Sequence, residues 1–150
     1  MKFSKELSAG YLVNHMARLF ERGLAERIRP LGLTPGTFPA LLELWEGDGL
    51  TQKELVERLD IEQATMANTL ARMERDRLVR RQKDEADGRV QRIWLTDHAR
   101  GLRNAAIEAA RSVNAETMAS LSAQEQRQLV ALMQKIVYDD KASATPTSSE

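Results

Sequence analysis

Cysteine is absent from this sequence of 150 residues, which excludes disulfide bonds, thiolate nucleophiles, thiolate metal sites and thiol redox switches. Long apolar runs are absent as well, since no stretch approaches the roughly 20 residues that a membrane helix requires. The first residues, MKFSKELSAGY, do not contain the continuous apolar segment of a signal peptide. We therefore expect a cytoplasmic protein with no membrane contact, and the length predicts a single domain over residues 1–150.

Net charge is also absent, because 22 Lys and Arg residues balance 22 Asp and Glu residues. The whole protein is therefore not a general binder of polyanions. The charges are unevenly distributed, since between residues 70 and 92 eight basic side chains outnumber five acidic ones, a local charge of +3. A neutral protein with one basic segment predicts an anionic partner that contacts that segment.

Signs of catalysis or metal binding are few. The two histidines, His15 and His98, lie in different predicted elements, and the spacing H-E-x-x-H does not occur. The sequence contains no recognisable nucleophile or cofactor loop, so an enzyme that uses His15 with a carboxylate is the weaker interpretation. We expect no cofactor, no metal and no catalytic residue.

The first half of the chain has the periodicity of helices. Apolar residues at spacings of three and four predict an amphipathic helix over residues 7–29. A second helix is expected after residue 34, and Pro39 requires that it either begins near Thr37 or is kinked. The sequence TQKE, which begins at Thr51, has the form of a capping box and predicts a short third helix.

A further short helix is predicted by Met66, Leu70 and Met73, which fall on one face. Strand-forming residues follow at 79–83 and 90–95, and the turn-forming stretch between Asp84 and Gly88 joins them. Two short helices followed by a two-stranded hairpin are the order of a winged helix-turn-helix. We therefore predict this DNA-binding unit over residues 34–96.

Terminal helices are predicted on both sides of this unit, over residues 7–30 and 97–139. Thr96 is the expected cap of the first C-terminal helix, and SAQE, beginning at Ser122, is a second capping box. Lone helices with apolar stripes need a partner, so we expect them to form a dimer. Residues 141–150 are predicted to be disordered. The fold class is mainly α with a small two-stranded β-wing.

In a winged helix-turn-helix, the second short helix lies in the major groove of duplex DNA and the wing contacts the backbone or the minor groove. Its exposed face is the one opposite the three apolar residues. The residues expected to specify bases are Ala64, Thr65, Asn68 and Arg72. The residues expected to fix the register on the phosphates are Arg75, Arg81 and Lys83, and Arg89 is expected in the minor groove. Each arginine is alternatively a solvated surface charge.

The stretch from residue 50 to 96 resembles the MarR family of transcriptional regulators. It contains LTQKELVERLDIEQATMANTLARMERDRLV followed by RRQKDEADGRVQRIWLT. The wing signature of that family is an Asp, one residue, an Arg, and then a strand ending in Leu-Thr. Asp87, Arg89, Leu95 and Thr96 match it, and with the flanking helices the resemblance covers about residues 7 to 139. From its position, Asp87 is expected to orient the Arg89 guanidinium or the turn.

The resemblance implies a homodimer with intertwined terminal helices, a wing arginine in the minor groove of a pseudo-palindromic operator, and repression that a small molecule relieves. The sequence departs from the family at two places. Ala67-Asn68 stands where an arginine commonly follows the threonine, which suggests a changed base preference. Arg77 stands where glycine is usual, so we expect the end of this helix to be built differently if that position is left-handed.

The resemblance also implies an effector pocket between the dimer helices and the winged unit. Tyr11, His15 and Trp45 are candidates to line it for a carboxylate or a phenol, although core packing or a surface hydrogen bond explains the same residues. Three alternatives remain for the function: a constitutive DNA-binding repressor, an activator, and a winged-helix module that binds another protein.

Overall fold

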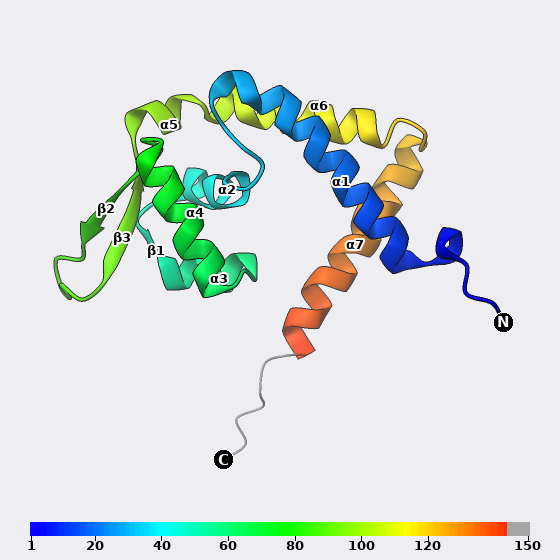
Figure 1. The fold of residues 1–150 in the computed structure, drawn as a ribbon, viewed down its shortest axis with the longest axis horizontal. Helices are drawn as coiled ribbons and strands as arrows, with labels where there is room; N and C mark the ends of the chain where they lie inside the picture. Colours follow the sequence, from blue (N-terminus) through cyan, green and yellow to red (C-terminus); the bar gives the residue numbers. More distant parts are fainter. Residues whose placement is uncertain (144–150) are drawn as a thin grey trace, which may run out of the picture. The chain divides into compact units, whose positions relative to one another are not determined.

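Figure 1 shows the computed structural model, which describes the backbone of residues 1–143 and the side chains of residues 1–139. Its elements are η1 Lys5–Leu7, α1 Ala9–Ile28, η2 Arg29–Leu31, α2 Phe38–Glu46, β1 Leu50–Thr51, α3 Gln52–Leu59, α4 Gln63–Arg75, β2 Val79–Lys83, β3 Gln91–Leu95, α5 Asp97–Gly101, α6 Arg103–Thr117 and α7 Ala123–Ser143. The chain forms two compact units, the first from Met1 to Val113 and the second from Asn114 onward. The predicted disordered tail overlaps the end of α7, and its residues 144–150 lie outside the described residues.

Three predicted helix starts are confirmed by side-chain caps. The Glu54 amide donates to the Thr51 hydroxyl at 3.1 Å, and the Thr51 amide donates to the Glu54 carboxylate at 3.3 Å. Ser122 and Glu125 form the same reciprocal pair at 3.1 and 2.9 Å, and Thr96 caps α5. The first amides of a helix have no partner within it, so these caps determine where α3, α7 and α5 begin.

The second helix begins at Phe38, immediately after Thr37, and Pro39 occupies its first turn. Proline is tolerated there because amides of the first turn have no carbonyl partner within the helix. Of the two alternatives that Pro39 left open, a helix beginning near Thr37 is therefore the correct one.

Two details of the predicted elements need correction. The sheet has three antiparallel strands in the order β1-β3-β2, because Leu50 pairs with Ile93 and adds a short strand to the hairpin. The long helix predicted after Thr96 is also divided into α5 and α6. The division follows Gly101, whose helix propensity is low, and the Leu102 amide there bonds the carbonyl of Ala99 in a tighter turn.

One hydrophobic core joins α2, α3, α4 and the sheet, and it also includes Ile28 of α1, Ala99 of α5 and Ala106 of α6. Its most deeply buried side chains are Ile28, Leu41, Leu44, Leu55, Met66, Leu70, Met73 and Ile93. Each contributes about 1.5–3 kcal/mol relative to an exposed position. The prediction that Met66, Leu70 and Met73 face inward is confirmed, and their burial fixes the rotation of α4 about its own axis.

The end of α4 is closed by a Schellman motif with Arg77 in the left-handed region, at φ 59°. The Leu78 amide donates to the Met73 carbonyl at 2.9 Å, and the Arg77 amide donates to the Glu74 carbonyl at 3.1 Å. Leu78 and Met73 are both buried, which supplies the apolar contact of this motif. The expectation that arginine changes the construction of this helix end is therefore wrong, because the usual motif forms around it.

Replacing Arg77 by glycine should raise the free energy of unfolding by about 1 kcal/mol, since glycine removes the steric cost of a Cβ in the left-handed region. Urea or thermal unfolding measures the change. Arg77→Lys keeps both the Cβ and the charge, and its stability should equal that of the parent. A glycine variant no more stable than the lysine variant would contradict this account.

Candidate nucleic-acid interface

The exposed face of α4 consists of Ala64, Thr65, Asn68, Arg72 and Arg75, all of which are open to solvent. This face lies opposite the buried methionines and leucine and contains no acidic residue. Small side chains allow a close approach to a groove. The Asn68 amide matches the donor and acceptor of an adenine edge, and an arginine fork matches guanine or phosphate.

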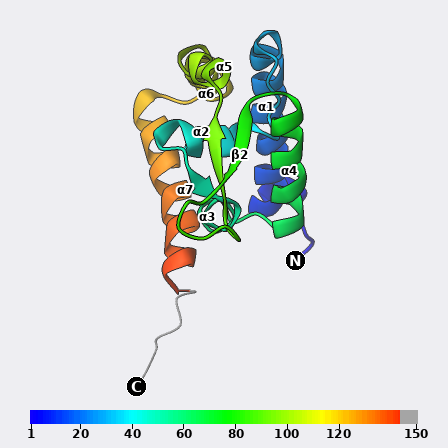
Figure 2. The same cartoon turned by 90° about the vertical axis from the view of Figure 1, so that its left-hand side faces the viewer.

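The arginines near this face differ in how they are held. Arg72 forms no ion pair with any residue in the described part of the chain. Arg75 lies 3.5 Å from Asp76, and Arg81 of β2 lies 3.4 Å from Glu74 of α4. Exposed pairs of this kind contribute about 0–1 kcal/mol, so phosphate can displace the carboxylate at little cost. Figures 1 and 2 show the hairpin of β2 and β3 beside α4.

The wing consists of residues 79–95, and two acidic side chains at its tip form hydrogen bonds that hold the turn. The Asp84 carboxylate accepts from the Ala86 amide at 2.7 Å, and the Asp87 carboxylate accepts from the Arg89 amide at 3.0 Å. The Asp84 amide in turn donates to the Val90 carbonyl at 2.8 Å, which closes the reversal. Asp84 and Asp87 therefore shape the turn, whereas Glu85 between them is exposed to solvent.

Arg89 projects from this tip with its side chain 92% exposed. Its Nε and Nη2 donate to the two carboxylate oxygens of Asp87 at 3.1 and 3.2 Å. From its position, Asp87 was expected to orient either the guanidinium or the turn. It contacts both the Arg89 guanidinium and the amide in the turn. A guanidinium held by two bonds has fewer orientations, which favours a defined approach to an anionic groove.

Arg92 attaches the wing to the rest of the winged unit, a role that the sequence did not suggest. Its Nε donates to Asp84 at 2.7 Å, and its Nη1 donates to the Gly49 carbonyl at 2.9 Å and lies 3.9 Å from Glu54. Gly49 has φ 83°, and a Cβ there would lie 2.8 Å from the Trp94 ring. Only glycine fits beside the Trp94 ring at position 49, so the bond between Arg92 and the backbone of residue 49 depends on both Arg92 and Gly49.

A shallow cleft of about 360 Å³ lies between the start of α3 and the wing. Its basic lining residues are Lys53, Arg81 and Arg89. Lys83, also predicted to contact DNA, is exposed at the end of β2. The predicted DNA-contacting residues thus lie on α4, on β2 and at the wing tip, all within the first compact unit.

The three candidate effector residues lie in different surroundings. Tyr11 and His15 are exposed on α1, whereas the Trp45 indole donates to the Ala99 carbonyl at 2.9 Å and packs edge-on against Phe38. Within the described residues, no hydrogen bond, ion pair or ring contact joins Trp45 to the other two. No group of three potential metal ligands occurs in that part of the chain, and none of its helices is long and apolar enough to cross a bilayer.

Comparison with known proteins identifies the family. The sequence model of the MarR family matches residues 31–90. Transcriptional regulator HosA of Escherichia coli O157:H7 is 34% identical over 125 residues, which cover 83% of this chain and 93% of HosA. The chain belongs to the MarR family of transcriptional regulators. The resemblance stated from the wing signature is therefore confirmed.

Solved MarR structures share the fold. A Mycobacterium tuberculosis MarR protein, Rv2887 in complex with salicylic acid, is 27% identical with a TM-score of 0.68, covering 86% of this chain and 96% of that one. MepR of Staphylococcus aureus, crystallised as a DNA complex, is 24% identical with a TM-score of 0.79, covering 89% of this chain and 98% of MepR. The predicted winged-helix fold of this MarR chain is thereby confirmed, with three strands in place of two.

Two of the three acids of the MarR wing, Asp84 and Asp87, have a pKa below the ordinary value of 3.8. The Ala86 amide and then the Arg92 side chain lower the pKa of Asp84, whereas the Arg89 side chain and then its amide lower that of Asp87. A carboxyl with a lowered folded pKa stabilises the fold above the unfolded pKa, and the contribution is lost as pH falls through the folded value. The wing contacts are therefore complete at neutral pH.

Arg92→Met should raise the pKa of Asp84 part of the way to 3.8, because the Ala86 amide bond remains. It should leave Asp87 unchanged. Arg89→Met should do the converse, and the two variants serve as controls for each other. Carbon-detected NMR titration of the aspartate carboxyls measures both values, and an unchanged Asp84 in Arg92→Met would show that the pair is absent in solution.

Proposed function

We propose that this MarR-family protein is a cytoplasmic homodimeric repressor that binds a pseudo-palindromic DNA operator and is released by a small phenolic or carboxylate effector. The observation that carries the proposal is the acid-free exposed face of α4 beside a wing whose tip arginine is almost fully exposed. A groove-sized helix with such a face, next to a basic wing, matches the shape and charge of duplex DNA.

Each half of the operator is contacted at three places in this proposal. The α4 helix enters the major groove, where Thr65, Asn68 and Arg72 contact base edges and Ala64 permits the close approach. The phosphates on either side are contacted by Arg75, Arg81 and Lys83, which fix the register without specifying sequence. Arg89 enters the adjacent minor groove, and Asp87 orients its guanidinium.

Dimer formation is supported by apolar side chains that remain exposed in each compact unit. In the first unit they are Phe3, Leu7, Leu12, Val13 and Leu19, and in the second they are Val130, Leu132, Ile136, Val137 and Tyr138. Monomeric proteins rarely leave large apolar patches open, so these faces favour a protein partner. A second copy of the chain is the simplest one, since two-fold dimers are the commonest assembly and match a palindromic site.

Release by a small aromatic acid is supported by Rv2887, a relative described as a transcriptional repressor, 27% identical over 139 residues and crystallised with salicylic acid. In this chain Tyr11 and His15 lie one helical turn apart on α1, with hydroxyl and imidazole groups that suit a carboxylate. We propose that they and Trp45 bind the effector in the dimer.

Arg89→Ala should weaken binding of the operator by about 1–3 kcal/mol, because it removes the minor-groove contact. The operator is first selected from random duplexes with the parent protein, and dissociation constants are then measured by fluorescence anisotropy. Arg111→Ala is the control, since it removes an exposed charge of the same sign on α6, where Arg111 pairs with Glu108. Equal affinity of Arg89→Ala and the parent for every duplex would refute the wing assignment.

The same selection tests the proposal as a whole. We expect an inverted repeat whose half-sites are about ten base pairs apart, and an affinity that falls steeply with salt because phosphate contacts release counterions. If no duplex is enriched at low salt, the winged-helix module that binds another protein becomes the better interpretation.

Salicylate should weaken operator binding by the parent, with sodium chloride at equal ionic strength as the reference because salt alone lowers affinity. His15→Ala should reduce this effect, since it removes a donor for the carboxylate. His98→Ala is the matched control, because that histidine is exposed on α5. Operator affinity that is insensitive to salicylate and to other hydroxybenzoates would favour a constitutive DNA binder.

A further inference from the structure

The sequence contains two Asp-Gly pairs, Asp48-Gly49 and Asp87-Gly88, and the structure places them in different surroundings. An Asp-Gly pair can isomerise without an enzyme, because glycine has no Cβ to hinder attack by its amide nitrogen on the preceding side-chain carboxyl. The reaction requires that this nitrogen and this carboxyl reach each other. The hydrogen bonds at each pair therefore decide which of the two can react.

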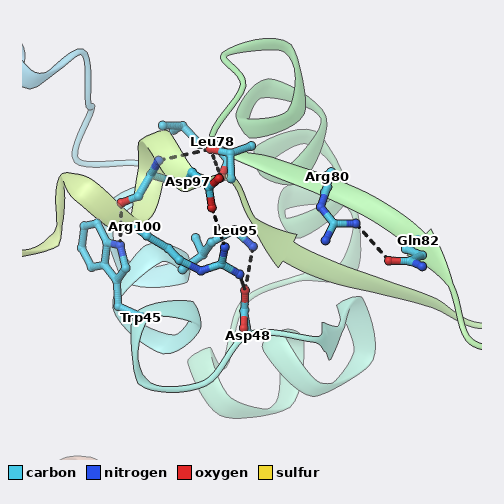
Figure 3. Close-up of polar contacts among 10 residues, drawn as sticks. Trp45, Asp48, Leu78, Arg80, Gln82, Leu95, Asp97 and Arg100 are labelled. Atoms are coloured by element: carbon cyan, nitrogen blue, oxygen red, sulfur yellow. Dashed lines mark hydrogen bonds and ion pairs between the residues drawn. The ribbon is translucent and has the colours of Figure 1, made fainter.

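The first pair is held at both reacting groups. Figure 3 shows the Asp48 carboxylate, which accepts from the Leu95 amide at 3.0 Å and from Arg100 Nη2 at 2.8 Å. The Gly49 amide donates to the Ile93 carbonyl at 2.7 Å. Gly49 is also buried, so its nitrogen cannot turn toward the carboxyl without breaking this bond inside the protein. We expect this pair to be inert in the folded protein.

The second pair lies at the tip of the wing, where only the carboxylate is held. Within the part of the chain that the structure describes, the Gly88 amide donates no hydrogen bond. Gly88 is exposed, and no atom beyond its chain neighbours lies within 4 Å of the position that a Cβ would take. The side chain of Asp87 is 41% exposed. The attacking nitrogen is therefore able to turn, as is usual at an exposed loop tip.

We propose that the Asp87-Gly88 pair isomerises spontaneously to isoaspartate, which disables the wing, and that Arg89 restrains this reaction. The restraint comes from the two bonds between the Arg89 guanidinium and the carboxylate oxygens of Asp87, at 3.1 and 3.2 Å. These bonds hold the side chain in place and favour its charged form. A carboxylate is a poorer target for a nitrogen nucleophile than a neutral carboxyl, because its oxygen leaves less readily.

The reaction consumes no reagent other than water. In the first step the Gly88 nitrogen forms a bond to Asp87 Cγ, and the carboxyl hydroxyl leaves with the amide proton as one water molecule. The product is a succinimide ring. In the second step water adds to the main-chain carbonyl carbon of Asp87, the bond from that carbon to the Gly88 nitrogen breaks, and the nitrogen regains a proton. One water leaves and one enters, so the mass is unchanged.

Isomerisation removes the contacts that define the tip. The main chain gains one methylene group, because it now runs through Cβ and Cγ of Asp87. The former main-chain carbonyl, which accepts from the Val90 amide at 3.0 Å, becomes part of the new carboxylate. Of the two side-chain oxygens that hold Arg89, one is lost as water and the other becomes a peptide carbonyl. The loss of the minor-groove contact that follows rests on the proposed function, whereas the chemical step does not.

The test of the chemical step is prolonged incubation of the purified protein at neutral pH, followed by tryptic peptide mapping. Trypsin separates the two pairs, because Asp48 falls in the peptide of residues 28–53 and Asp87 in that of residues 84–89. Electron-transfer fragmentation distinguishes isoaspartate from aspartate at equal mass. We expect isoaspartate to accumulate at Asp87 and not at Asp48. Its absence at Asp87 would overturn the inference, as would equal accumulation at both pairs, which is the behaviour of an unfolded chain.

Two variants separate the attacking nitrogen from the restraint. Gly88→Ala should slow the reaction, since a methyl group hinders the attack, and the open space at this position accommodates it. Arg89→Met should accelerate the reaction, because the carboxyl of Asp87 is no longer held. Arg92→Met is the matched control, since Arg92 pairs with Asp84 in the same wing. Equal rates in Arg89→Met and Arg92→Met would overturn the role of Arg89.

The effect on DNA binding is measured on the incubated parent, after ion-exchange chromatography has separated the isomerised form from the unmodified one. The isomerised form should bind the selected operator about fivefold or more weakly, the lower end of the loss expected when the Arg89 contact is removed. Equal affinity of the two forms would overturn the claim that the reaction disables the wing. A parent that selects no operator would refute the proposed function alone, because accumulation at Asp87 is measured without DNA.

Discussion

The burial of Met66, Leu70 and Met73 determines the surface that this protein presents to a partner. These side chains pack into the core that α4 shares with α3 and the sheet, each at 1% exposure or less. Because a helix repeats every 3.6 residues, three buried positions fix the direction of all the others. Rotating α4 would remove about 1.5–3 kcal/mol for each buried side chain, so its exposed face cannot turn away from the solvent side.

The acids of the wing have a structural use that explains why they lie beside a proposed DNA contact. Asp84 and Asp87 each accept from a backbone amide of the tip and from an arginine, which satisfies these two carboxylates within the wing. Without these two acids the tip would be less defined in shape, and their pairing with arginines reduces the repulsion that they would exert on phosphate. The combination gives an exposed Arg89 on a turn whose conformation is fixed before any partner arrives.

Local signals were sufficient to predict much of the fold. The capping boxes at Thr51 and Ser122 and the apolar stripe of α4 are complete within a few residues, so the sequence contains the whole interaction. The two-residue strand β1 is too short for any periodicity. The contacts of Arg92 with Gly49 and of Arg100 with Asp48 join residues 43 and 52 positions apart. They form only because β1 pairs with β3 and α5 follows β3 directly. The sequence also cannot assign Trp45, because its position in the apolar pattern of its helix is equally typical of a residue that lines a pocket and of a residue that packs in the core.

The pairing of charges also bears on how this regulator distinguishes an operator from other DNA. Arg75, Arg81 and Arg89 each have a carboxylate within 3.5 Å, so in the proposed complex a phosphate or groove must replace or share that partner. Part of the electrostatic attraction for any duplex is thereby offset, which suits a protein with no net charge. In the proposed complex, Asn68 and Arg72 contact base edges, and Arg72 forms no ion pair with any described residue. These contacts would then account for a larger share of the discrimination, since they are made only with the right sequence.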